Sequence, residues 1–323
     1  MLRRILAAFE PFVLLLLATV VIASLLPPRG VWVTGFDRAA DAGIVLLFLL
    51  HGAKLSREAI IGGLRAWPLH LAVLAMTFGI FPLLGLAMIA LPILPAALAT
   101  GFLFLTLLPS TVQSSIAFTS IARGNVAAAV CSASFSNLAG MVVTPMLATL
   151  LIRGHGSGQA QVPMAQVEGI LLQLLLPFVL GHLLRPWIGG WIGRRKALVT
   201  AVDRGSILLV VYTAFGAAVV GGLWRQVSGG DMAVLLAMCA ALLTIVLLLT
   251  WYGAKAMRLD RANAIVLLFC GSKKSLASGV PIAGVLFPTA QVGMAILPLM
   301  LFHQIQLIAC AVIARRLEEG RAD

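Results

Sequence analysis

Residues 107–115 read Leu-Leu-Pro-Ser-Thr-Val-Gln-Ser-Ser, and residues 269–275 read Phe-Cys-Gly-Ser-Lys-Lys-Ser. Each stretch interrupts a long apolar run with polar residues, and an offset of 161 residues aligns Ser114 with Ser275. Pro109 lacks an amide hydrogen and clashes with the preceding turn, and the glycine of the second stretch weakens a helix. The pattern predicts two interrupted helices in corresponding positions. A simple kink stays open for the first stretch, because membrane helices tolerate proline and serine.

The composition is that of a membrane protein. Of the 323 residues, 61% are hydrophobic and 11% are charged, whereas soluble domains carry roughly 25% charged residues. This disfavours a soluble enzyme, a nucleic-acid-binding module and a disordered protein. The net charge of +12 comes from basic residues in short loops between apolar runs, which indicates membrane orientation. All four cysteines lie within apolar runs and no CxxC or HExxH motif occurs, so we expect no disulfide, metal or cofactor.

Ten apolar runs approach the length of about 20 residues that a membrane-spanning helix needs. The Gly- and Gln-rich residues 153–165 separate them into two halves of five, about 9–152 and 166–314. Two halves with an odd number of spans have opposite orientations, which is the arrangement of inverted-repeat transporters. The predicted spans are 9–26, 42–56, 68–91, 95–121, 125–152, 166–187, 205–225, 232–254, 262–287 and 290–314.

The loop charges set an orientation for these spans. With the N-terminus in the cytoplasm, 17 loop Lys and Arg residues lie on the cytoplasmic side and 4 lie on the opposite side. Cytoplasmic loops of membrane proteins carry such an excess of basic residues. The sequence therefore predicts that both termini are cytoplasmic.

Lys273 and Lys274 lie in the middle of the ninth predicted span. An ionised lysine at this depth costs roughly 2.5–3.5 kcal/mol by insertion scales, so such residues usually face a cavity and pair with another group. All eleven acidic residues lie at span ends, in loops or in the tail. The partners are then freed backbone carbonyls, hydroxyls or an anionic substrate, unless the lysine is neutral. If only one of the two faces a cavity, Lys273 is weakly favoured, and an error in the span boundaries would place both in a loop.

Other polar residues within spans belong to the same candidate site. Asn125 and Asn137 lie in the fifth span, whose serines are better explained as packing residues. His303, Gln304 and Gln306 of the tenth span could line the same cavity. The predicted substrate- or ion-binding residues are Pro109, Ser110, Thr111, Gln113, Ser114, Ser115, Asn125, Asn137, Gly271, Ser272, Lys273, Lys274, Ser275 and Gln304.

The chain resembles a known family in its ten-span pattern, in the two interrupted stretches, in the run 122–127 (Ala-Arg-Gly-Asn-Val-Ala) and in Thr144-Pro145. These features are similar to the bile acid:sodium symporter (BASS/SBF) family, and in particular to its branch of bacterial SBF-like symporters. The resemblance implies one transporter domain over 1–323 in the inner membrane, with interrupted spans 4 and 9 crossing beside the site. It also implies a core domain of about 68–152 and 232–314, and a panel domain of about 9–56 and 166–225.

The sequence departs from that family at the residues that bind sodium. Sodium-coupled members carry a glutamate at the break of span 9, where this chain has Phe269 or Cys270. The hydroxyls of their span 5 fall on Ala129 and Ala133. Na⁺ is still possible as the coupling ion, but a lysine in place of the cation, proton coupling and uniport are the other interpretations.

The predicted function is secondary transport of an organic anion, bile-acid-like or a carboxylate, by alternating access. The expected partners are that anion and the lipid bilayer, with no nucleic acid. An enzyme is not expected, because no nucleophile–base pair and no set of metal ligands lies at one depth. The alternative is a membrane channel or a regulatory subunit of another transporter.

Overall fold

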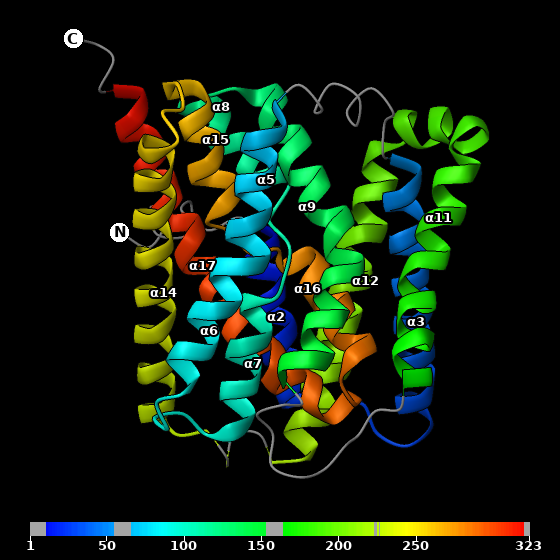
Figure 1. The fold of residues 1–323 in the computed structure, drawn as a ribbon. Helices are drawn as coiled ribbons and strands as arrows, with labels where there is room; N and C mark the ends of the chain where they lie inside the picture. The colour runs from blue at the N-terminus through cyan, green and yellow to red at the C-terminus, as the bar shows by residue number, and fades with distance from the viewer. Residues whose placement is uncertain (1–10, 55–65, 153–163, 223–224, 226, 320–323) are drawn as a thin grey trace. The chain divides into compact units, whose positions relative to one another are not determined.

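The computed structural model describes residues 11–54, 66–152, 164–222, 225 and 227–319. Within these residues the regular secondary structure is all helical, with no strand (Figure 1). A helix satisfies its backbone hydrogen bonds within one segment, which is what an apolar chain in lipid requires.

Six helices among the described residues are long and apolar enough to cross a membrane, which makes this a multi-pass membrane protein. The ten-span count and the inverted repeat stay predictions. The six are Trp67–Ile89, Val126–Ile152, Ala197–Val220, Gly229–Ala256, Arg261–Leu286 and Thr289–Glu319.

The chain divides into two compact units. Unit 1 comprises Met1–Leu55, Thr149–Ser228 and Val280–Ile296, and unit 2 comprises Ser56–Ala148, Gly229–Gly279 and Leu297–Asp323. The helices α16 (Leu276–Leu286) and α17 (Thr289–Glu319) each contribute to both units.

Four helices, α2 (Pro11–Leu25), α3 (Val31–Lys54), α11 (Met164–Arg194) and α12 (Lys196–Val220), belong to unit 1. The backbones of α3 and α11 touch. A Cβ atom added to Gly52 would lie 1.9 Å from the carbonyl oxygen of Phe178, and one added to Gly181 would lie 1.9 Å from that of Leu49. Small residues of this kind let membrane helices approach closely.

Unit 2 contains the remaining helical segments. They begin with α5 (Trp67–Ala75), which continues through a π-helical turn, η2 (Met76–Ile80), into α6 (Phe81–Ile89). Next come α7 (Ala96–Thr106), α8 (Gln113–Ile121) and α9 (Val126–Leu147), which runs on into η3 (Ala148–Ile152), where unit 2 ends at Ala148. The set is completed by α14 (Gly229–Ala256), α15 (Arg261–Gly271) and parts of α16 and α17.

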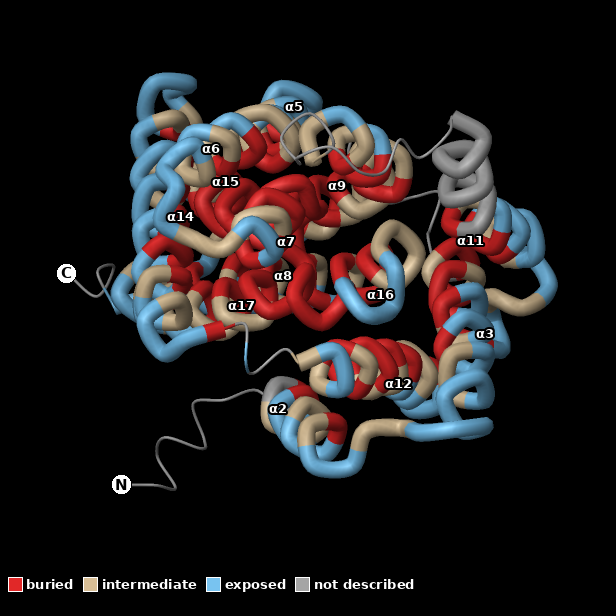
Figure 2. The backbone as a smooth tube through the Cα atoms, turned by 90° about the horizontal axis from the view of Figure 1, so that it is seen from below, coloured by how far each residue is buried: buried red, intermediate tan, exposed pale blue. Residues whose placement is uncertain are grey.

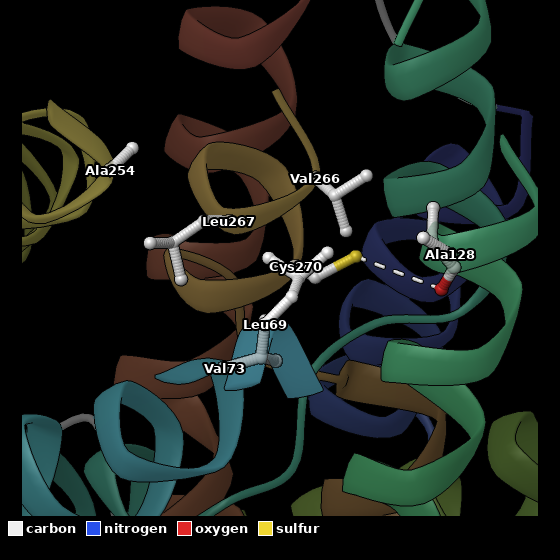
Figure 3. Packing of buried hydrophobic residues seen from close by; sticks show 8 residues of the cluster. Leu69, Val73, Ala128, Ala254, Val266, Leu267 and Cys270 are labelled. Carbon is white, nitrogen blue, oxygen red and sulfur yellow. Dashed lines mark hydrogen bonds between the residues drawn. The ribbon is translucent and has the colours of Figure 1, made fainter. Parts of the chain in front are cut away.

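The apolar core of unit 2 surrounds α15 (Figure 2). Figure 3 shows Val266, Leu267 and Cys270 of this helix between side chains of α5, α9 and α14. The Cys270 thiol also donates to the carbonyl oxygen of Ala129 at 3.8 Å. Because α15 is buried on nearly every side, the segment that follows it begins deep within the unit.

Candidate binding site at two helix breaks

Helical structure stops at Thr106 and resumes at Gln113, and residues 107–112 between them are called the first break. Pro109 provides no amide hydrogen for the helix. The next amide, of Ser110, donates to the Ser136 hydroxyl of α9 at 3.0 Å. The regular helical bonds to the last carbonyls of α7 are therefore lost, and other groups must replace them.

Side chains of α9 bind the carbonyl oxygens that the first break releases. The Thr144 hydroxyl donates to Leu107 at 2.8 Å, and the Asn137 amide donates to Ser110 at 2.8 Å. At Gly140 a Cβ atom would lie 2.7 Å from the Pro109 ring, so glycine is needed for α9 to approach the break. The first break is consequently held in place by α9.

The second break comprises residues 272–275, between the end of α15 at Gly271 and the start of α16 at Leu276. It is bonded directly to the first. The Ser110 hydroxyl donates to the carbonyl oxygen of Cys270 at 2.6 Å, and the Ser115 hydroxyl donates to that of Phe269 at 3.0 Å. In return, the Ser275 amide donates to the carbonyl oxygen of Pro109 at 2.9 Å. The two interrupted stretches thus form one hydrogen-bonded site.

The Lys274 ammonium lies where these segments meet. Its Nζ atom donates to the carbonyl oxygens of Thr106 at 2.8 Å, Leu108 at 2.7 Å and Thr77 at 2.7 Å. It also lies 4.1 Å from the centre of the Phe81 ring. The residue is 0% exposed. Three charge-assisted hydrogen bonds and a cation–π contact replace the water that this ammonium gives up.

The Thr77 carbonyl is available because of a proline one turn further along. In the η2 turn, the Phe81 amide donates five residues back to Met76. In the same register the next donor would serve Thr77, but residue 82 is a proline and has no amide hydrogen. The π-helical turn and Pro82 together release the oxygen that Lys274 binds.

Gln306 of α17 fixes the backbone of Lys274. Its side-chain oxygen accepts from the Lys274 amide at 2.9 Å, and its nitrogen donates to the Lys274 carbonyl at 2.8 Å. The same nitrogen lies 2.9 Å from His303 Nδ1. One glutamine therefore satisfies both backbone groups of a residue that lies outside any helix.

Lys273 is just as buried but differs from its neighbour in its contacts. Among the described residues its Nζ atom has no hydrogen-bond partner. It lies 4.2 Å from the centre of the Phe118 ring and 5.3 Å from that of Phe269. The side chain is thus held between aromatic faces, and its hydrogen-bonding capacity is unused.

The remaining predicted residues divide into those at the breaks and those elsewhere. Thr111 and Ser115 exchange a hydrogen bond of 2.9 Å, and Ser114 donates to Thr111 at 2.9 Å. Ser272 donates back to the Leu268 carbonyl at 2.5 Å. Gln113 begins α8 and is exposed. All of these belong to the two breaks or to their edges.

Asn125 is engaged elsewhere, at the N-cap of α9. Its side chain accepts from the Ala128 amide at 3.0 Å and donates to Asn263, near the start of α15, at 3.0 Å. Gln304 lies in α17, and its side-chain nitrogen and oxygen are buried without a hydrogen-bond partner in the described part of the chain. Neither is hydrogen-bonded to the breaks.

Two groups of residues in the site differ from the sequence analysis. The serines of α9 were expected to serve in packing, and Ser136 in addition accepts a hydrogen bond from the first break. Thr77, Thr144 and Ser278 were not predicted, although Ser278 donates to the Asn137 side chain at 2.7 Å. For Thr77 the sequence offered no signal, because in a regular α-helix Pro82 would release the carbonyl of Phe78 instead.

Comparison with known proteins identifies the family. The model of the SBF-like CPA transporter family (DUF4137) matches residues 10–319. The chain belongs to this family. Both helix breaks and every residue of the candidate site lie within the matched range, so the site belongs to the shared domain of a transporter family.

The chain is also similar to individual proteins, two of which are named as transporters. The chain is 52% identical over 309 residues to "Putative symporter YfeH" of Escherichia coli, covering 95% of this chain and 92% of that protein. It is 52% identical over 317 residues to "Uncharacterized protein PA2026" of Pseudomonas aeruginosa, covering 97% and 94%. The similarity extends at 24% identity over 276 residues to "Sodium/bile acid cotransporter 7" of the rat, covering 84% and 80%.

Proposed function

We propose that this protein is a secondary active transporter that moves an organic anion across the inner membrane by alternating access, and that the two breaks form its binding site. Membership of a transporter family supports the general class. Interrupted helices in corresponding positions of two halves are the best sequence pointer to a transporter site. Here the two interruptions are bonded to one another at the centre of unit 2.

The Lys273 amine carries the proposal that the substrate is an anion. It is fully buried, lacks a hydrogen-bond partner among the described residues, and lies against the rings of Phe118 and Phe269. From residue 261 to residue 317 the sequence contains no acidic residue. A positive charge without a carboxylate partner favours a negatively charged ligand, which Lys273 would reach when the rings of Phe118 and Phe269 move apart.

The starts of two helices strengthen this preference. The N-terminus of a helix carries partial positive charge, and transporters direct the ends of interrupted helices at anionic substrate groups. Both α8 and α16 begin at the breaks, at Gln113 and Leu276. Around these starts Gln113 is exposed, and Ser114, Asn137 and Ser278 are partly exposed. These four side chains provide the polar surface that a substrate would meet first.

The movement that we propose is of a core against a panel, with the core about 68–152 and 232–314 and the panel about 9–56 and 166–225. The division into two compact units supports most of it, because both breaks belong to unit 2, whereas α2, α3, α11 and α12 belong to unit 1. The segment Val280–Ile296 is the exception, because it lies within the proposed core but belongs to unit 1. Alternating access in such transporters is largely a rigid-body movement around a fixed site.

The test is uptake by purified protein in liposomes, with taurocholate and short carboxylates as probes and with Na⁺, K⁺ or a pH gradient as driving force. We expect saturable uptake of at least one anion, and its loss in Lys273→Gln. Thermal unfolding of both proteins controls for folding. Ohmic, non-saturating currents would identify a channel instead. Uptake by a folded Lys273→Gln protein equal to that of the wild type would remove this amine from substrate binding.

A further inference from the structure

Three carbonyl oxygens surround Lys274 Nζ, and the course of the backbone at each of them explains why it is free to bind a cation. The carbonyl oxygen of Thr77 lacks a helical donor because residue 82 is a proline. That of Thr106 lacks one because the Ser110 amide donates to Ser136 instead. Leu108 lies within the first break, where the helix has ended. All three are backbone carbonyls, and they converge from two separate segments on one point.

The chemistry of these three oxygens favours monovalent cations as ligands. Rings of neutral backbone carbonyls replace the hydration shell of monovalent cations, as in potassium channels. Divalent cations are usually bound with the help of carboxylates, whereas Lys274 Nζ contacts backbone carbonyls and phenylalanine rings. The Phe81 ring at 4.1 Å presents the negative face that also attracts a cation. The ammonium–oxygen distances of 2.7–2.8 Å suit an ion of ammonium-like size.

We propose that the carbonyl oxygens of Thr77, Thr106 and Leu108 form a monovalent-cation site that Lys274 fills with its own ammonium. The protein thus carries a tethered cation where an exchangeable ion would bind. One consequence for coupling rests on the proposed function, namely that transport needs no free Na⁺ or K⁺ at this position. The cation site itself is inferred from the geometry of the three oxygens alone.

Lys274→Ala tests the site by emptying it. The variant leaves three buried carbonyls without a donor and leaves room for an ion. We expect its thermal unfolding temperature to be well below that of the wild type in choline chloride. Potassium, sodium or methylammonium chloride at the same ionic strength should raise that temperature in proportion to the logarithm of the salt concentration. The wild type should respond equally to all four salts.

Two variants serve as matched controls. Lys274→Met fills the same volume without charge, so it should be destabilised and should not respond to small cations. Lys273→Ala removes an equally buried lysine that has no carbonyl partner, so it should not respond either. If Lys274→Ala does not fold in any salt, Lys274→Ser takes its place, since its short side chain also leaves room for an ion.

The outcomes separate this inference from the transport proposal, because unfolding is measured without a substrate. A selective response to small monovalent cations in Lys274→Ala or Lys274→Ser supports the site. An equal response to choline, or the same response in Lys273→Ala, overturns it. Where uptake has been established, Lys274→Ala uptake should in addition become dependent on the cation that stabilises the variant.

Discussion

Replacing Gln306 with leucine should strongly destabilise unit 2, and the structure gives the size of the effect. Leucine is close to glutamine in volume, so the loss is one of hydrogen bonds. The Lys274 amide and carbonyl would both lose their partner in an interior that excludes water. Leaving a buried polar group unsatisfied costs about 1–3 kcal/mol, so two such groups give about 2–6 kcal/mol.

Gln304 provides the matched control, because it lies in the same helix and its side-chain nitrogen and oxygen are also buried. Those two atoms have no hydrogen-bond partner among the described residues, so Gln304→Leu should leave stability unchanged or raise it. The assay is thermal unfolding of the two purified variants in the same detergent. A Gln306→Leu protein as stable as Gln304→Leu would refute the view that Gln306 holds the second break.

Three further predictions concern residues around the site. Gly140→Ala should lower stability by about 1–3 kcal/mol, because the new methyl group overlaps the proline of the first break. Gly253→Ala, with open space around it, should not lower stability, and the unfolding temperatures of the two variants test this. Asn125→Ala should cost about 1 kcal/mol through the lost helix cap, and Asn125→Asp should retain the cap, as the same measurement will show. Phe118→Leu should cost about 0.5–2 kcal/mol by removing the ring nearest to the Lys273 amine, and an equal loss in a Lys273→Met background would contradict that attribution.

Much of the fold follows from features visible in the sequence. Apolar run lengths identify helices long enough to span a membrane, and α7 ends three residues before Pro109. The absence of acidic residues at mid-span left carbonyls, hydroxyls or a substrate as lysine partners, and carbonyls are confirmed for Lys274. Local chemistry therefore indicated the kind of group that Lys274 binds.

The choice between the two lysines could not be read from the sequence. Neighbouring residues in a regular helix point about 100° apart, but residues 272–275 are not helical, so no periodicity applies to them. That Lys273 is the one to face a cavity stays a prediction, whereas the hydrogen bonds of Lys274 could not be foreseen. The carbonyl of Thr77 lies nearly 200 positions away in the chain, and its release depends on a π-helical turn that residue patterns do not reveal.

Asn125 shows the opposite situation, in which a local signal was present and was given another meaning. An asparagine directly before an alanine-rich run is a typical helix N-cap. The structure uses it in that way, and α15 begins in the same manner with Asp260. A polar residue at the edge of a predicted span is thus better read first for capping and only then for ligand binding.

The glycines at positions 52 and 181 have a mechanical consequence. Because the backbones of α3 and α11 are in direct contact at these glycines, the two helices cannot slide or roll past one another without a steric collision. The two helices therefore behave as one rigid body. Any bending during a working cycle must be accommodated by other parts of the protein.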